Sequence, residues 1–209
     1  MPQARPPQPE SPYAWARLFA ALLLSAIGGV GMWSVIVVLP AVQAEFGAAR
    51  SAAALPYTVT MVCTGFGSIV LGRLSDRFGI IVPVAGGAVA LGLGYAAAGL
   101  APSLGLFALA QGVLVGGATA ATFAPLIADT SLWFTRNRGI AVAIIACGSY
   151  VAGTVWPPVV AHFVAQVGWR WTYVGIGLFC VATMLPLSLA LRRRSPLVAP
   201  VAARNPGVA

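Results

Sequence analysis

Asp76 and Arg77 are the charged residues whose setting says most about possible chemistry. They lie in residues 72–79, GRLSDRFG, a short run between two long apolar stretches. Gly72 and Gly79 at its two ends permit a tight turn and a close approach of the flanking segments. The Asp76 carboxylate can accept hydrogen bonds from a helix amino terminus or pair with an arginine. The run predicts a charged turn; the plainer alternative is a basic loop that orients membrane segments.

Nucleophilic chemistry would have to use Ser149 and His162, because the chain has one histidine. Both lie in one apolar stretch, thirteen residues apart, which is about 20 Å along a helix axis. A nucleophile and its base must approach to about 3 Å. We therefore expect no catalytic residues and no enzyme. Cysteines 63, 147 and 180 lie within apolar stretches without the spacing of metal ligands, so we expect neither a metal site nor a cofactor.

The composition indicates a membrane protein. Hydrophobic residues make up 59% of the chain and charged residues 8%, which is too little charge to cover the surface of a soluble domain. A net charge of +8 could suit nucleic acid, but the arginines lie in short loops between apolar stretches, which is typical of membrane orientation. We expect the lipid bilayer as a partner, and no nucleic acid.

Six apolar stretches position these residues, at approximately 18–40, 52–71, 80–100, 104–127, 139–165 and 171–191. Each has about 20 residues or more, enough to cross a hydrocarbon core of about 30 Å as a helix. They lack the alternation of barrel strands. The stretches predict an all-α membrane protein: six transmembrane helices over 17–194, between a disordered tail, 1–16, and a second tail, 195–209. A signal peptide is the alternative for the first stretch, but that stretch is longer than a typical h-region.

The arginines also predict the orientation. If the amino terminus lies in the cytoplasm, ten arginines fall on the cytoplasmic side, and only Arg50 and Arg170 fall on the other. This matches the positive-inside rule. We therefore expect a multi-pass protein of the inner (plasma) membrane with both termini cytoplasmic.

The charged residues that share the cytoplasmic depth should form a cluster. We expect Asp76 to lie near Arg136 or Arg138, and Asp129 to lie near Arg77. Separations beyond about 8 Å, the Debye length at physiological salt, would contradict a local cluster.

Polar residues recur on one side of the fourth stretch. At about 100° per residue, Gln111, Thr119 and Thr122 fall within about 80° of one another. Such a stripe should face protein or a water-filled cavity rather than hydrocarbon; hydrogen bonding within and between helices is the alternative. The candidates for lining a cavity are Trp33, Tyr57, Gln111, Thr119, Thr122, Tyr150 and Trp156.

Residues 72–79 resemble the G-x-L-x-D-R-x-G signature of the major facilitator superfamily, which lies between helices two and three in that family. Ile80 and Ile81 depart from the basic residues that often follow. The resemblance implies one half of the family's fold, six helices in a 3+3 arrangement. It also implies a gating role at the cytoplasmic face, which would be carried here by Gly72, Asp76, Arg77, Gly79, Asp129, Arg136 and Arg138.

Two further runs are similar to monocarboxylate and oxalate/formate carriers. Residues 133–141, WFTRNRGIA, resemble their entry to helix five, and residues 168–171, GWRW, resemble their entry to helix six. Two positions depart from the carriers. Ile27 replaces an acidic residue before Gly28, and Ala108 replaces the arginine of an Arg-x-x-Gln-Gly run. Both departures weaken the case for proton coupling in this half.

The resemblance implies secondary active transport of small solutes by alternating access, with organic anions such as monocarboxylates as a candidate class and the substrate itself unknown. One half does not enclose the family's usual cavity, so we expect an N-terminal half whose partner is a second six-helix half. We favour a truncated piece of a longer transporter over a half that functions by pairing with itself or with another half. The alternatives are a non-transporting six-helix membrane protein and an inactive truncated fragment.

Overall fold

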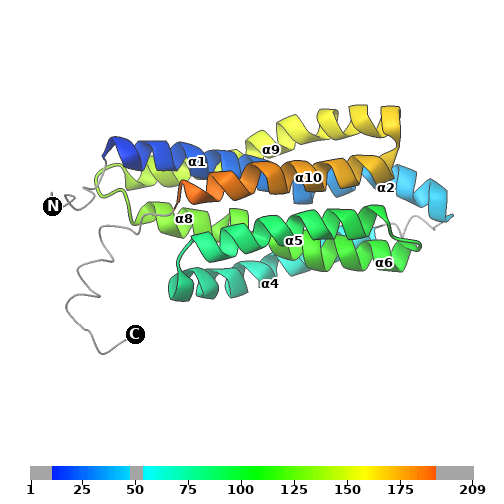
Figure 1. Cartoon of the computed structure of the whole chain (residues 1–209), viewed down its shortest axis with the longest axis horizontal. Helices are drawn as coiled ribbons and strands as arrows, with labels where there is room; N and C mark the ends of the chain where they lie inside the picture. The colour runs from blue at the N-terminus through cyan, green and yellow to red at the C-terminus, as the bar shows by residue number, and fades with distance from the viewer. Residues whose placement is uncertain (1–10, 48–53, 192–209) are drawn as a thin grey trace.

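The computed structural model describes residues 11–47 and 54–191, which form an elongated helical bundle (Figure 1). Six of its spans are long and apolar enough to cross a membrane, as the sequence predicts. The first span consists of α1 (Pro12–Gly28) and α2 (Val30–Phe46). The second, third, fifth and sixth are α4 (Leu55–Phe78), α5 (Ile81–Gly99), α9 (Arg138–Val167) and α10 (Trp169–Leu189).

The fourth span is irregular. It is built from α6 (Leu104–Leu109), the π-helix η1 (Ala110–Gly116), α7 (Gly117–Thr119), the 3-10 helix η2 (Ala120–Thr122) and α8 (Ala124–Ser131). Pro125 lies in the first turn of α8, where its missing N–H costs no helical hydrogen bond.

The first helix begins earlier than the sequence predicts. The side chain of Ser11 caps α1 by accepting a hydrogen bond from the Ala14 N–H, and Pro12 occupies the first turn. Serine at the cap and proline at the first helical position are both favoured helix-start signals. Residues 12–16, assigned to the tail by their proline content, are therefore helical. Residues 1–10 and the expected second tail, 195–209, lie outside the described residues.

The bundle has two ends that differ in charge. At the motif end, α4 ends with residues 72–78 and turns into α5 at Gly79 and Ile80, and α8 leads to α9 through residues 131–138. The start of α1 and the end of α10 lie there too (Figure 1). The distal end holds the end of α2, the turn from α5 to α6, and the turn from α9 to α10.

Small residues bring the spans into close contact. A Cβ atom added to Gly177 of α10 would lie 2.9 Å from the backbone oxygen of Gly92 in α5. A Cβ atom added to Gly116 of η1 would lie 2.8 Å from the backbone oxygen of Thr60 in α4. Such approaches let dispersion forces hold helices together where lipid offers no hydrophobic drive.

The spans are unequally covered by the rest of the chain. In the most apolar 18-residue window, 11% of α4 and 22% of α9 are buried, against 39% to 56% for the other four spans. Of the six spans, α4 and α9 are therefore the two with the fewest buried residues.

Candidate functional site

The expectation that Asp76 and Arg77 lie in a turn is wrong, because residues 72–78 are the helical end of α4 and the chain turns only at Gly79 and Ile80. Gly79 has a φ of +84°, a left-handed conformation that favours glycine, and its N–H donates to the Ser75 carbonyl. This glycine ends α4 and lets the chain reverse into α5. Asp76 and Arg77 are both exposed at the motif end, so both side chains are accessible to a partner at that face.

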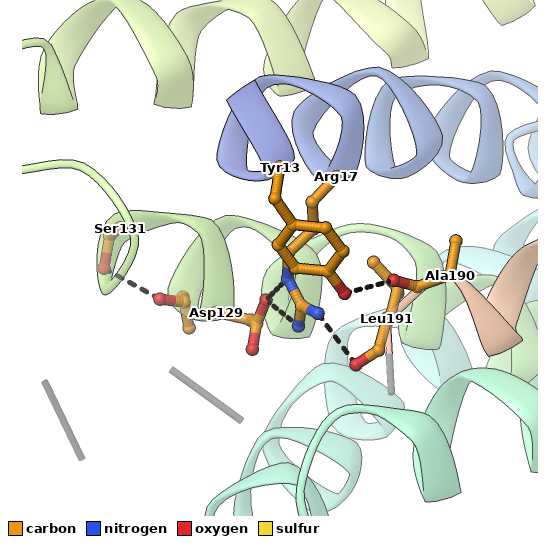
Figure 2. A network of polar contacts seen from close by, with 7 residues as sticks. Tyr13, Arg17, Asp129, Ser131, Ala190 and Leu191 are labelled. Carbon is orange, nitrogen blue, oxygen red and sulfur yellow. Dashed lines mark hydrogen bonds and ion pairs between the residues drawn. The ribbon is translucent and has the colours of Figure 1, made fainter. Parts of the chain in front are cut away.

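Asp129 lies nearby at the end of α8, and its ion-pair partner is Arg17 of α1. The Arg17 Nη2 and Asp129 Oδ2 atoms are 2.7 Å apart, and Arg17 Nε donates to the same oxygen at 3.2 Å (Figure 2). The side chains are 2% and 15% exposed, respectively. The sequence-based expectation paired Asp129 with Arg77; the structure pairs it with Arg17, because α1 packs against the fourth span at this depth.

Arg17 also reaches the end of α10. Its Nη1 donates to the Leu191 carbonyl at 2.8 Å, and the Tyr13 hydroxyl donates to the Ala190 carbonyl at 2.9 Å (Figure 2). The Arg17 guanidinium lies 4.8 Å from the ring centroid of Trp133. We call Tyr13, Arg17, Asp129 and the two carbonyls the Arg17 clamp. It joins three helix ends and caps carbonyl groups that a helix end leaves without partners.

The other expected contact at the motif end concerns Asp76. Within residues 11–47 and 54–191, Asp76 forms no ion pair. Arg136 and Arg138 are exposed, and Arg138 donates to the Ser131 hydroxyl at 3.3 Å. The proposed gating role of Asp76 and Arg77 stays a prediction.

A second arginine cluster closes the distal end. Arg170 Nη2 lies 2.7 Å from Glu45 Oε1, and Arg170 Nη1 donates to the carbonyls of Gly99 and Ala101 at 2.8 and 2.9 Å. The Trp169 indole also donates to Glu45. We call these five residues the Arg170 clamp. It joins the ends of the first and third spans to the start of the sixth.

Three of the cavity candidates lie inside the bundle. Gln111, Thr119 and Thr122 are 0%, 5% and 2% exposed. Gln111 Nε2 donates to the Gly31 carbonyl at 3.0 Å, and each threonine donates to a carbonyl of its own span. Among the described residues, the Gln111 carbonyl oxygen has no partner. These side chains pack the fourth span against the first.

The other candidates lie nearer the surface. Tyr57 of α4 is 37% exposed and Tyr150 of α9 is 75% exposed. Trp33 and Trp156 are half-buried: Gly153 packs against the Trp33 ring, and the Trp156 indole donates to the Ala26 carbonyl at 2.9 Å. Tyr57 and Tyr150 are thus the candidates that present a hydroxyl on the two least covered helices.

An apolar groove of about 620 Å³ separates α9 from α10, with part of α1 as its third wall. Trp156, Phe163 and Phe179 are among its lining residues, and none of the lining residues is charged. The groove therefore offers a hydrocarbon-like surface rather than a site for an ion.

The elements of hydrolytic or metal chemistry are not brought together here. One continuous helix, α9, carries both Ser149 and His162, so about 20 Å of helix separates them. In the described ranges, 11–47 and 54–191, no three residues of the types His, Cys, Asp and Glu gather into a metal-binding group.

Arg17 is the site residue that sequence reasoning missed, because it was counted only as an orienting charge. The signal that could have found it is its position. Arg17 lies at the start of the first apolar stretch, and no acidic residue lies within a helical turn of it. If Arg17 is buried in the bundle, its charge needs a carboxylate from a distant part of the sequence.

Comparison with known proteins agrees with this fold. Residues 21–207 match the model of the Major Facilitator Superfamily. The chain is 30% identical over 130 residues to the MFS-type transporter pynF of Aspergillus niger and 31% identical over 130 residues to the fujikurins efflux protein of Gibberella fujikuroi. It is also 31% identical over 144 residues to monocarboxylate transporter 12 of Mus musculus.

These matches cover 62%, 62% and 66% of this chain, in that order, but only 30%, 28% and 29% of the relatives' own lengths. The chain thus corresponds to well under half of each of these transporters. With six membrane-spanning helices, the charged run of residues 72–79 and the family match over most of its length, this multi-pass membrane protein belongs to the Major Facilitator Superfamily of transporters.

Proposed function

We propose that the chain is the N-terminal half of a secondary active transporter and moves small organic solutes by alternating access together with a second six-helix half. The observation that carries this proposal is the low coverage of α4 and α9, which are 11% and 22% buried in their most apolar windows. In transporters built from two repeats, the binding site lies between them near the bilayer midplane.

The polar and small residues of α4 and α9 support the view that these two helices face protein or water rather than lipid alone. Tyr57 and Tyr150, each of which carries a polar hydroxyl, are 37% and 75% exposed, and polar groups in hydrocarbon are costly. On α4, a Cβ atom added to Gly65 or Gly72 would meet nothing within 4 Å. Small residues of this kind permit another helix to approach closely.

Monocarboxylates are the substrate class we propose first. Support comes from residues 133–141 and 168–171, which are similar to the helix entries of monocarboxylate carriers, and from the match to monocarboxylate transporter 12. Because the membrane-spanning part of this half carries no charge deep in a span, the cation that binds the carboxylate would come from the second half.

The orientation belongs to the same proposal. The protein lies in the inner (plasma) membrane, and its motif end faces the cytoplasm. At that face, the gating charges are Asp76, Arg77, Arg136 and Arg138. The asymmetry of ten arginines against two supports this orientation.

The test is uptake of labelled lactate and pyruvate into proteoliposomes. The 209-residue chain is reconstituted alone and with a second six-helix half supplied as a separate polypeptide. Uptake that appears only with the second half supports the proposal, and uptake by the chain alone indicates a half that pairs with itself. A chain that neither transports nor associates with any second half would be a non-transporting membrane protein, which is the competing function.

A further inference from the structure

The two clamps have one feature in common: each ties the first span to the sixth. At the motif end, Tyr13 and Arg17 of α1 donate to the carbonyls of Ala190 and Leu191 at the end of α10. At the distal end, Arg170 of α10 pairs with Glu45 of α2. The first and sixth spans are therefore joined at both ends by hydrogen bonds that an arginine donates.

Between the clamps, residues 18–44 of the first span and 171–189 of the sixth contain no arginine. Ala26 and Ile27 of α1 line an apolar groove together with five residues of α10 between Trp171 and Phe179. The first span runs through this region as one helix, because Gly29, between α1 and α2, has a φ of −60° and a ψ of −15° and its N–H donates to the Ser25 carbonyl. The arginine contacts of the pair therefore lie at its two ends, and the groove lies between them.

We propose that Arg17 and Arg170 are positioning residues that hold the first and sixth spans together at the two ends of the unit, so that the pair moves as one body. The reason for such a brace rests on the proposed function, since alternating access requires one half to move as a unit against the other. The brace itself follows from the contacts.

The two clamps differ in strength. The Arg17–Asp129 pair is 2% and 15% exposed, whereas the Arg170–Glu45 pair is 36% and 42% exposed. Removing one partner of a buried pair leaves an uncompensated charge, whereas an exposed pair is screened by salt. The Arg170 clamp is therefore the weaker of the two. The first and sixth spans separate more easily at the distal end than at the motif end.

Distance measurements between spin labels test the brace on the whole 209-residue chain in lipid nanodiscs. Cysteines 63, 147 and 180 are replaced by alanine. One label pair reports on the motif end, at the exposed positions Ala16 and Leu189, and a second pair reports on the distal end, at Ala44 and Trp171. The clamps are cut with Arg17→Gln or Asp129→Asn at one end and Arg170→Gln or Glu45→Gln at the other. Arg73→Gln, an exposed arginine of α4 outside both clamps, is the matched control.

We expect each cut to abolish the narrow distance peak at its own end and to leave the other end unchanged, with no effect of the control. Salt gives a second measurement without a clamp mutation. Raising it from 0.01 to 1 M shortens the Debye length from about 30 to about 3 Å and should broaden only the distal peak.

The brace is overturned if the cuts change neither peak, or if a cut at one end broadens both peaks equally, which is the behaviour of a general loss of stability. None of these measurements requires transport. A brace that fails while uptake succeeds refutes the positioning role alone, and a brace that holds without uptake refutes the proposed function alone.

Discussion

Arg17 and Asp129 lie 112 positions apart in the sequence and meet in a buried ion pair of 2.7 Å (Figure 2). The pair fixes where the first span crosses the end of the fourth, at the same face as the charged residues 72–79 at the end of α4. Because Arg17 also donates to the Leu191 carbonyl, one side chain sets the relative positions of three spans. A change at Asp129 should therefore be felt well beyond α8.

Neutralising Asp129 should destabilise the protein far more than neutralising Glu45. Asp129→Asn leaves the Arg17 charge buried without a counter-charge, at a cost of about 3–5 kcal/mol. Glu45→Gln removes a pair of which both side chains are more than a third exposed, and exposed pairs contribute about 0–1 kcal/mol. Thermal unfolding of both variants in the same detergent measures the difference in stability. Equal losses from the two substitutions would show that burial does not set the strength of these pairs.

Two glycines of α10 allow a matched test of helix packing. A Cβ atom on Gly177 would lie 2.9 Å from the Gly92 backbone oxygen and 3.0 Å from Tyr95 Cβ, whereas one on Gly175 would meet nothing within 4 Å. Gly177→Ala should force α10 away from α5 and cost about 1–3 kcal/mol, as overpacking does. Gly175→Ala should be neutral or slightly stabilising, because alanine is the better helix former. Melting temperatures of the two variants check this, and a destabilised Gly175→Ala variant would contradict the packing described.

The six spans were predictable because lipid imposes a length and an apolar composition that a single sequence displays. The start of α1 was not placed correctly, since the prolines of the first residues pointed to a tail. Ser11 and Pro12 are in fact a helix-start pair, and their cap geometry became clear only in the structure.

The fourth span shows why the cavity candidates were harder to place. The stripe of Gln111, Thr119 and Thr122 assumed 100° per residue throughout. The π-helix Ala110–Gly116 and the 3-10 helix Ala120–Thr122 change that angle in opposite directions. Periodicity also identifies one polar face without telling which neighbour covers it. Here α2 covers Gln111, whose amide donates to the Gly31 carbonyl.

The Arg17 clamp lay beyond sequence reasoning for a different reason. An arginine at the start of a span satisfies the positive-inside rule whether or not it is paired. Its partner is chosen by the packing of the first span against the fourth, and no local pattern encodes a contact over 112 residues.

The orientation predicts opposite labelling of the two ends. Cysteine introduced at Asp76, in a chain whose own cysteines are replaced by alanine, should react with a membrane-impermeant maleimide only after cells are opened. Cysteine introduced at the exposed Gln166, four residues before Arg170, should react in intact cells, because the arginine-poor side faces outward. A permeant maleimide that labels both positions serves as the control. Labelling of position 76 in intact cells would reverse the orientation and, with it, the gating role of Asp76 and Arg77.

Tyr150 should affect transport without affecting folding. Its side chain is 75% exposed on α9, so Tyr150→Ala should change the free energy of unfolding by less than about 0.5 kcal/mol. If α9 faces the second half or the solute path, the same variant should lower uptake in the paired proteoliposomes, and Tyr150→Phe should separate the hydroxyl from the ring. Leu178→Ala is the control, because Leu178 is 68% exposed on α10 and should alter neither quantity. Full uptake by Tyr150→Ala would contradict this role. It would place this face of α9 against lipid, where the Tyr150 side chain has no contact with the solute.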